Sequence, residues 1–179
     1  MKNKTLRMAA GLLFVAVTVM TVIQNTTWAV FQGSINIYAF LDLSEILAFI
    51  LLAVSAFTAV HVIAAVGGAM LGLVYLFNFA DMLRVGILRK DLEVEYLLYS
   101  GLLTAACVFI ILFAVVKQSR VIGFIMTALW FLGNLIHMVF GFAGMFFVVR
   151  LNTGNYLPLI IPLMTVLALL MYALSARKE

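Results

Sequence analysis

The segment Gly72–Met82 reads GLVYLFNFADM, and 56 residues later the segment Ala128–Met138 reads ALWFLGNLIHM. The two segments share an asparagine and a methionine at matching positions, and leucine accounts for their other identities. The same offset places Asp42–Met82 on Leu98–Met138 without a gap, and ten of the 41 positions are identical. An internal repeat of this kind indicates that the two regions fold as copies of one structural unit.

The repeat indicates a break within an apolar run that is continuous by hydropathy. Residues Tyr38–Asp81 would form a single helix on the order of 60 Å long, which is twice the thickness of the hydrocarbon core of a membrane. In the repeat alignment His61–Ala64 falls on Lys117–Arg120, whose sequence KQSR is polar and predicts a turn. We therefore expect a helical hairpin that turns near residues 61–65.

The composition indicates an integral membrane protein. Of the 179 residues 66% are hydrophobic and only 10% are charged, whereas soluble domains carry about 25% charged residues. No stretch has the alternating pattern of a transmembrane β-strand. The net charge is +4, and the basic residues lie between apolar runs. They therefore favour contact with a lipid bilayer, and no nucleic-acid partner is expected.

The predicted fold is all-α: a single polytopic membrane domain, residues 1–179, with six transmembrane helices arranged as three tandem hairpins. A span needs roughly 20 apolar residues. The predicted helices cover residues 6–24, 39–61, 65–83, 95–116, 121–147 and 156–175. The first run could instead be a signal peptide, with TWA at residues 27–29 as its cleavage site. Because its length of about 18 residues is long for a signal core, a transmembrane helix is the preferred interpretation.

The distribution of Lys and Arg predicts the orientation. Seven of these residues fall on one side of the predicted topology: Lys2, Lys4, Arg7, Lys117, Arg120, Arg177 and Lys178. Four fall on the other side: Arg84, Arg89, Lys90 and Arg150. Cytoplasmic loops are the richer in basic residues. The sequence therefore predicts a multi-pass protein of the cell membrane with both termini in the cytoplasm.

Polar side chains gather near the outer ends of the predicted helices. Eight of them form the candidate ligand-binding site: Thr21, Gln24, Asp42, Glu45, Asn78, Asp81, Asn134 and His137. A spacing of three residues puts each pair on one helix face, and ionisable groups within a span face cavities or partners. If the three odd-numbered helices pack together, these side chains would form a polar ring that opens outward.

A purely structural interpretation stands beside this one. Amide and hydroxyl side chains commonly hydrogen-bond between transmembrane helices and hold a bundle together. Asp81 would then lie at the membrane boundary and pair with Arg84, and Asp42 and Glu45 would be interfacial acids. Aromatic residues at the outer helix ends, such as Tyr96 and Tyr99, have the positions of an interfacial aromatic belt.

The sequence gives no sign of catalytic or cofactor chemistry. The single cysteine, Cys107, lies in the middle of a span and has no partner for a disulfide within the chain. His61 and His137 would lie about 24 Å apart in depth, too far to hold one haem. The common metal, nucleophile and phosphate-binding motifs do not occur. We therefore expect neither an enzyme nor a metal or other cofactor.

The preferred function is binding or transport of a small polar solute or ion through an outward-facing site. The size and helix count resemble those of the membrane substrate-binding subunits of energy-coupling-factor vitamin transporters. That family's Ala-x-x-x-Ala docking pattern is absent from the first helix, RMAAGLLFVAVTVM, so the resemblance covers architecture alone. Active transport would need other membrane subunits, and a homo-oligomer is also compatible with the sequence. The alternative is a non-transporting membrane sensor, immunity factor or assembly subunit that contacts a protein partner.

Overall fold

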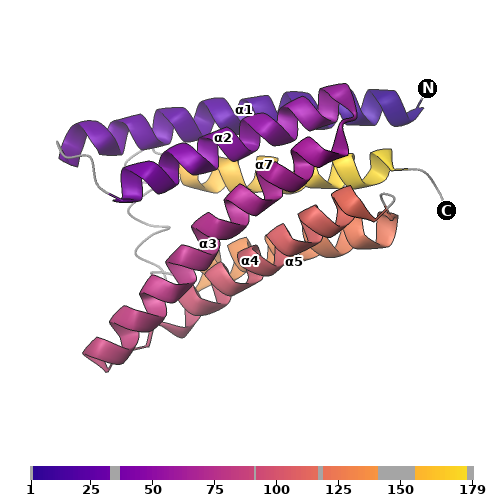
Figure 1. Ribbon diagram of the computed structural model, residues 1–179. Helices are drawn as coiled ribbons and strands as arrows, with labels where there is room; N and C mark the ends of the chain where they lie inside the picture. The colour runs from indigo at the N-terminus through magenta and orange to yellow at the C-terminus, as the bar shows by residue number, and fades with distance from the viewer. Residues whose placement is uncertain (1, 33–36, 91, 117–118, 141–155, 177–179) are drawn as a thin grey trace.

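The computed structural model describes residues 2–32, 37–90, 92–116, 119–140 and 156–176. The described residues form six helices. The helices are α1 (Lys2–Gln32), α2 (Ile37–Thr58), α3 (His61–Arg89), α4 (Val94–Val115), α5 (Arg120–Val139) and α7 (Leu157–Ser175). The termini of the described chain lie at the same end of the bundle, which we call the terminal end, and the opposite end is the distal end (Figure 1).

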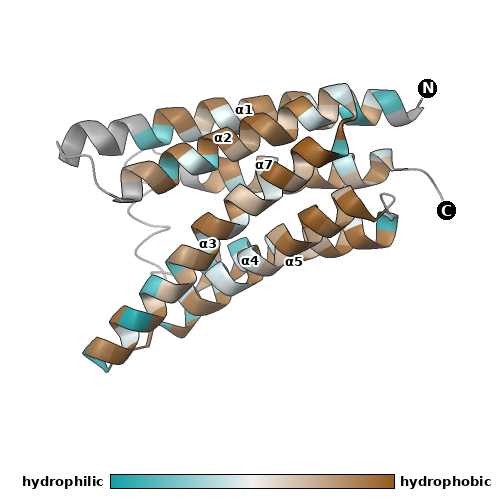
Figure 2. Ribbon diagram, viewed as in Figure 1, coloured by the Kyte–Doolittle hydropathy of each residue, from teal (hydrophilic) through white to brown (hydrophobic). Residues whose placement is uncertain are grey.

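The apolar helices fit an integral, multi-pass membrane protein. Within the described residues, α1 to α5 are long and apolar enough to cross a membrane, whereas the apolar run of α7, Leu159–Ser175, is shorter. Large apolar side chains point outward, among them Leu12, Leu73 and Val121, each more than 60% exposed. The helices are hydrophobic through their middle parts, and hydrophilic segments lie toward their ends (Figure 2). An outer surface of this kind suits a lipid environment.

The six helices form a closed ring. Each helix packs mainly against two neighbours, in the order α1, α2, α3, α4, α5, α7 and back to α1. The expectation that the odd-numbered helices pack together was therefore wrong. Helices α2 and α3 are separated only by Ala59 and Val60 and pack against each other, and the contact between α1 and α7 closes the ring. Figure 1 shows that α1, α2 and α7 diverge from α3, α4 and α5 toward the distal end.

Small residues allow the closest contacts between helices. A Cβ atom added at Gly123 on α5 would lie 2.6 Å from the Cβ of Ala173 on α7. A Cβ added at Gly68 on α3 would lie 2.9 Å from Ile110 on α4. Both distances are shorter than van der Waals contact, so neither position has room for a larger side chain. The glycines of α3 thus serve packing within the chain.

The long apolar run is interrupted at Ala59–Val60, slightly before the predicted turn at residues 61–65. Ala59 has a φ of 63°, in the left-handed region, and its N–H donates to the carbonyl of Ser55 at 2.8 Å. Val60 is extended, and α3 begins at His61. A left-handed residue ends a helix because its backbone cannot continue the right-handed hydrogen-bond pattern.

Other helix ends differ from the predicted ones. Helix α3 continues to Arg89 instead of ending at residue 83, because polar residues such as Arg84 are good helix formers that hydropathy discounts. It is about 44 Å long, longer than the hydrocarbon core is thick. Helix α1 likewise continues to Gln32. Helix α5 ends at Val139, and residues 141–147 of the predicted fifth helix lie outside the described residues.

Candidate functional site

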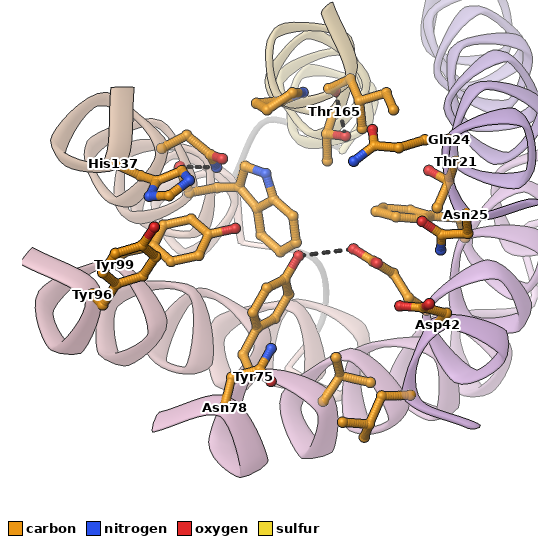
Figure 3. Close-up of a pocket in the computed structure, with 18 residues that line it drawn as sticks. Thr21, Gln24, Asn25, Asp42, Tyr75, Asn78, Tyr96, Tyr99, His137 and Thr165 are labelled. Atoms are coloured by element: carbon orange, nitrogen blue, oxygen red, sulfur yellow. Dashed lines mark hydrogen bonds between the residues drawn. The ribbon is translucent and has the colours of Figure 1, made fainter. Parts of the chain in front are cut away.

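The distal half of the ring encloses a cavity of about 460 Å³. All six described helices contribute to its wall, and Figure 3 shows them surrounding it. The lining residues are Thr21, Gln24, Asn25, Leu41, Asp42, Glu45, Phe49, Val74, Tyr75, Asn78, Tyr96, Tyr99, Trp130, Asn134, His137, Ile161, Pro162 and Thr165. A volume of this size accommodates a small organic molecule.

Helical periodicity explains why these residues share the cavity. On α5 the lining residues are Trp130, Asn134 and His137, spaced by four and three positions. On α2 Asp42 and Glu45 are also three positions apart. Residues spaced by three or four lie on the same face of an α-helix. Each helix of the ring therefore turns one face with at least one polar side chain toward the cavity at its distal half.

Seven of the eight candidate residues line this cavity: Thr21, Gln24, Asp42, Glu45, Asn78, Asn134 and His137. They come from four helices, α1, α2, α3 and α5. The eighth, Asp81, is not part of the lining. Its carboxylate accepts a hydrogen bond from the exposed guanidinium of Arg84 at 3.0 Å, as the structural interpretation of this residue predicts.

A hydrogen bond between two helices lies at the centre of the site. The hydroxyl of Tyr75 on α3 donates to Oε1 of Glu45 on α2 at 3.0 Å. In Figure 3 the ring of Tyr75 points toward the middle of the cavity, where its hydroxyl meets the carboxylate. Edge-on contacts with Tyr99, at a centroid distance of 6.3 Å, and with Trp130, at 5.6 Å, hold the ring. The carboxylate of Glu45 therefore has a fixed partner in a half-buried position.

Aromatic rings from α4 and α5 form one wall. The imidazole of His137 stacks on the ring of Tyr99 at a centroid distance of 4.5 Å and meets the ring of Tyr96 edge-on at 5.2 Å. Figure 3 shows the three side chains together on one side of the cavity, opposite the polar groups of α1. Tyr96 and Tyr99, which the sequence suggested as interfacial belt residues, thus also line the cavity with their rings.

Several polar lining groups bond within their own helix. The hydroxyl of Thr21 donates to the carbonyl of Val17 at 2.9 Å, and the hydroxyl of Thr165 donates to that of Ile161 at 2.9 Å. Nδ2 of Asn134 donates to the carbonyl of Trp130 at 2.8 Å, also one turn back.

These bonds satisfy buried donors but do not tie one helix to another. Nδ2 of Asn25 is buried and has no hydrogen-bond partner among the described residues. It is a donor beside the cavity that can serve an incoming acceptor.

Two acidic side chains line the cavity. Asp42 and Glu45 contribute two carboxylates from one face of α2. None of the described residues that line the cavity is a lysine or an arginine, although the chain as a whole contains 11. His137 is the one lining side chain that can carry a positive charge. The described residues contain no group of three or more His, Cys, Asp or Glu side chains that could hold a metal ion.

The candidate residues left out more than half of the lining. Among the polar residues omitted are Asn25, Tyr75, Tyr96, Tyr99, Trp130 and Thr165. Three of them follow from helical spacing, since Asn25 follows Thr21 by four residues, Tyr75 precedes Asn78 by three and Trp130 precedes Asn134 by four. Thr165 and its neighbours on α7 carry no comparable signal, because α7 has no candidate residue from which to count.

Comparison with known proteins adds no assignment. No protein-family model, no curated protein and no solved structure matches this chain. The site must therefore be interpreted from its own geometry and chemistry.

Proposed function

We propose that this protein binds a small polar solute or ion in the distal cavity and takes part in its transport across the membrane. The observation that carries the proposal is the cavity itself, about 460 Å³ with a mainly polar lining drawn from all six described helices. Polar groups within a membrane span are costly, and they persist where they serve a cavity or a partner. A water-accessible binding site would explain why these polar groups lie within the spans.

The bond from Tyr75 to Glu45 joins two helices, but the hydrogen bonds of three other lining residues favour binding over a purely structural role. If the polar groups served mainly to hold helices together, their partners would lie on other helices. Thr21, Asn134 and Thr165 instead bond to carbonyls of their own helices. Such groups contribute little to the contact between helices, and they keep the surface of the cavity polar.

The proposed topology has six transmembrane helices in three tandem hairpins related by the internal repeat. The distal end faces the outside of the cell membrane, and both termini are cytoplasmic. Arg7 and Arg120 lie at the terminal end, and Asp42 lies at the distal end. The positive-inside tendency supports this orientation, in which the cavity receives its ligand from outside.

Labelling of single cysteines tests the orientation. In a Cys107→Ala background, an Arg89→Cys variant in intact cells should react with a membrane-impermeant maleimide, because Arg89 is exposed at the distal end of α3. A His61→Cys variant, at the opposite end of the same helix, should react only after permeabilisation. Labelling of His61→Cys in intact cells, with Arg89→Cys protected, would reverse the proposed topology.

Ligand screening tests the function. The purified protein should retain a small molecule in native mass spectrometry, or gain thermal stability from a member of a metabolite panel. A ligand at 100 times its Kd adds about 2.7 kcal/mol, and this corresponds to a rise in Tm of about 5–10 °C. His137→Ala should reduce the rise, because His137 lines the cavity. The control Asp81→Asn, a change outside the lining, should preserve it.

The alternative function gives a different outcome. A sensor, immunity factor or assembly subunit would co-purify with a protein partner and show no response to the panel. If no compound binds and His137→Ala behaves like Asp81→Asn in every assay, the proposal is wrong. Co-purification of an ATPase or of another membrane chain together with ligand binding would identify the transport machinery.

A further inference from the structure

We infer that the ligand of the distal cavity is a small organic cation, an amine or quaternary ammonium compound with an apolar or aromatic body. This inference rests on the proposed binding function and specifies the chemical class of the ligand. It is carried by the combination, within one cavity, of two carboxylates and several aromatic rings, with no lysine or arginine among the described lining residues.

The balance of charge favours a cationic ligand. Asp42 and Glu45 lie on one face of α2, three residues apart. Like charges at this spacing repel each other when both are ionised, and a cation bound between them relieves the repulsion. None of the described lining residues is a Lys or Arg that could neutralise them from within the site. An anionic ligand would face these carboxylates directly.

The aromatic residues distinguish an organic cation from a metal ion. The ring of Tyr75 contacts both the ring of Tyr99 and the ring of Trp130 edge-on. Aromatic rings attract organic ammonium groups through their negative faces and also cover the apolar body of a ligand. A metal ion would instead need a set of oxygen or nitrogen ligands at short distances. The described residues supply no cluster of three or more such ionisable groups.

The bond between Glu45 and Tyr75 places one carboxylate beside the aromatic rings. Because the hydroxyl of Tyr75 donates to Oε1 of Glu45 at 3.0 Å, the carboxylate is held at the edge of the Tyr75–Trp130 pair. An ammonium group can then contact the carboxylate while its hydrocarbon part lies along the rings. The buried donor Nδ2 of Asn25 could serve a hydroxyl or carbonyl oxygen on the same ligand.

Matched probes test the inference directly. The chain has two tryptophans, Trp28 and Trp130, so a Trp28→Phe variant reports on the cavity through Trp130 fluorescence alone. This variant is titrated with 2-phenylethylamine, with its neutral analogue 2-phenylethanol and with the anionic analogue 3-phenylpropanoate. Choline serves as a quaternary ammonium probe, and sodium chloride and calcium chloride serve as inorganic controls. The ammonium probes should bind at least about 10-fold more tightly than the alcohol, and the carboxylate should not bind.

Variants that remove one negative charge at a time show which carboxylate contributes most to binding of the cation. Glu45→Gln retains an acceptor for Tyr75 but removes the charge, and it should weaken binding of 2-phenylethylamine about 10- to 100-fold. Asp42→Asn should weaken it less, because Glu45 is the carboxylate that accepts the hydrogen bond of Tyr75. The matched control Asp81→Asn removes a carboxylate that is paired with Arg84 outside the lining, and it should leave the affinity unchanged.

The outcomes separate this inference from the proposed function. Tighter binding of the alcohol or of the carboxylate, or a screened ligand that lacks a cationic nitrogen, would overturn the cationic class and leave the binding function standing. A response to sodium or calcium alone would replace the organic cation with an inorganic one. If neither the probes nor the metabolite panel bind, the binding function falls together with the inference.

Discussion

Tyr172→Ala should lower the free energy of unfolding by about 3–5 kcal/mol, the cost of removing a large aromatic ring from a packed core. Tyr172 is almost fully buried. Its hydroxyl lies 2.8 Å from that of Ser55 on α2, and its ring contacts Phe14 on α1 and Phe113 on α4. One side chain of α7 therefore joins four helices of the ring, and its loss opens a void between them.

Reversible unfolding in mixed micelles of detergent and sodium dodecyl sulfate measures this change. Tyr172→Phe keeps the ring and removes the hydroxyl, so it should cost only about 1 kcal/mol. Leu167→Ala, on the exposed side of the same helix, provides a control for helix propensity and should change stability by less than about 1 kcal/mol. An equal effect of the Tyr172→Ala and Leu167→Ala variants would contradict the central role of Tyr172.

The second large effect concerns access to the cavity. Thr165→Trp should reduce ligand affinity by at least about 100-fold, because the indole would occupy the space that the ligand needs. Thr165 is buried, lines the cavity and hydrogen-bonds only one turn back along α7. Its replacement therefore removes no hydrogen bond between helices among the described residues. Calorimetric titration measures the loss, using the compound identified in the metabolite screen, with 2-phenylethylamine as a reference.

Two companion variants make this result specific. Thr165→Val has nearly the same volume and leaves the cavity open, so its affinity should stay within about 10-fold of that of the parent chain. Leu163→Trp adds the same indole on an exposed position of α7 and should bind normally. Normal binding by a folded Thr165→Trp variant would show that the ligand binds elsewhere.

The helical, membrane-type architecture could be predicted from the sequence. Apolar composition and runs of about 20 apolar residues indicate directly that helices are surrounded by lipid. The interruption of the long run was placed within a few residues of Ala59–Val60. The left-handed conformation of Ala59 could not be predicted, because alanine carries no preference for it. The ring arrangement was also missed, since helix order within a bundle depends on packing between distant residues such as Gly123 and Ala173.

The candidate site was partly predictable for a related reason. An amide or acid in an apolar helix is conspicuous, so residues such as Asn134 and Glu45 stand out in the sequence. Aromatic residues do not, because the same tyrosine suits a membrane interface, a core or a binding site. The roles of Tyr75 and Tyr99 become visible only when α2, α3 and α4 are placed beside one another. Asp81 shows the opposite error: this acid stands out in the sequence and was included in the candidate site, but it pairs with Arg84 outside the cavity.

The short link between α2 and α3 is a point about which α3 could tilt relative to α2. Along the described chain, only Ala59 and Val60 connect the helices that group with α1 to those that group with α4. This link lies at the terminal end, and α3 extends from it as a lever of 29 residues. A rotation of about 5° at the link would move the far end of α3 by about 4 Å, given a helix length of about 44 Å. In the proposed topology, a small tilt of α3 at its cytoplasmic end would therefore produce a larger displacement at the distal end, where it would change the width of the cavity opening.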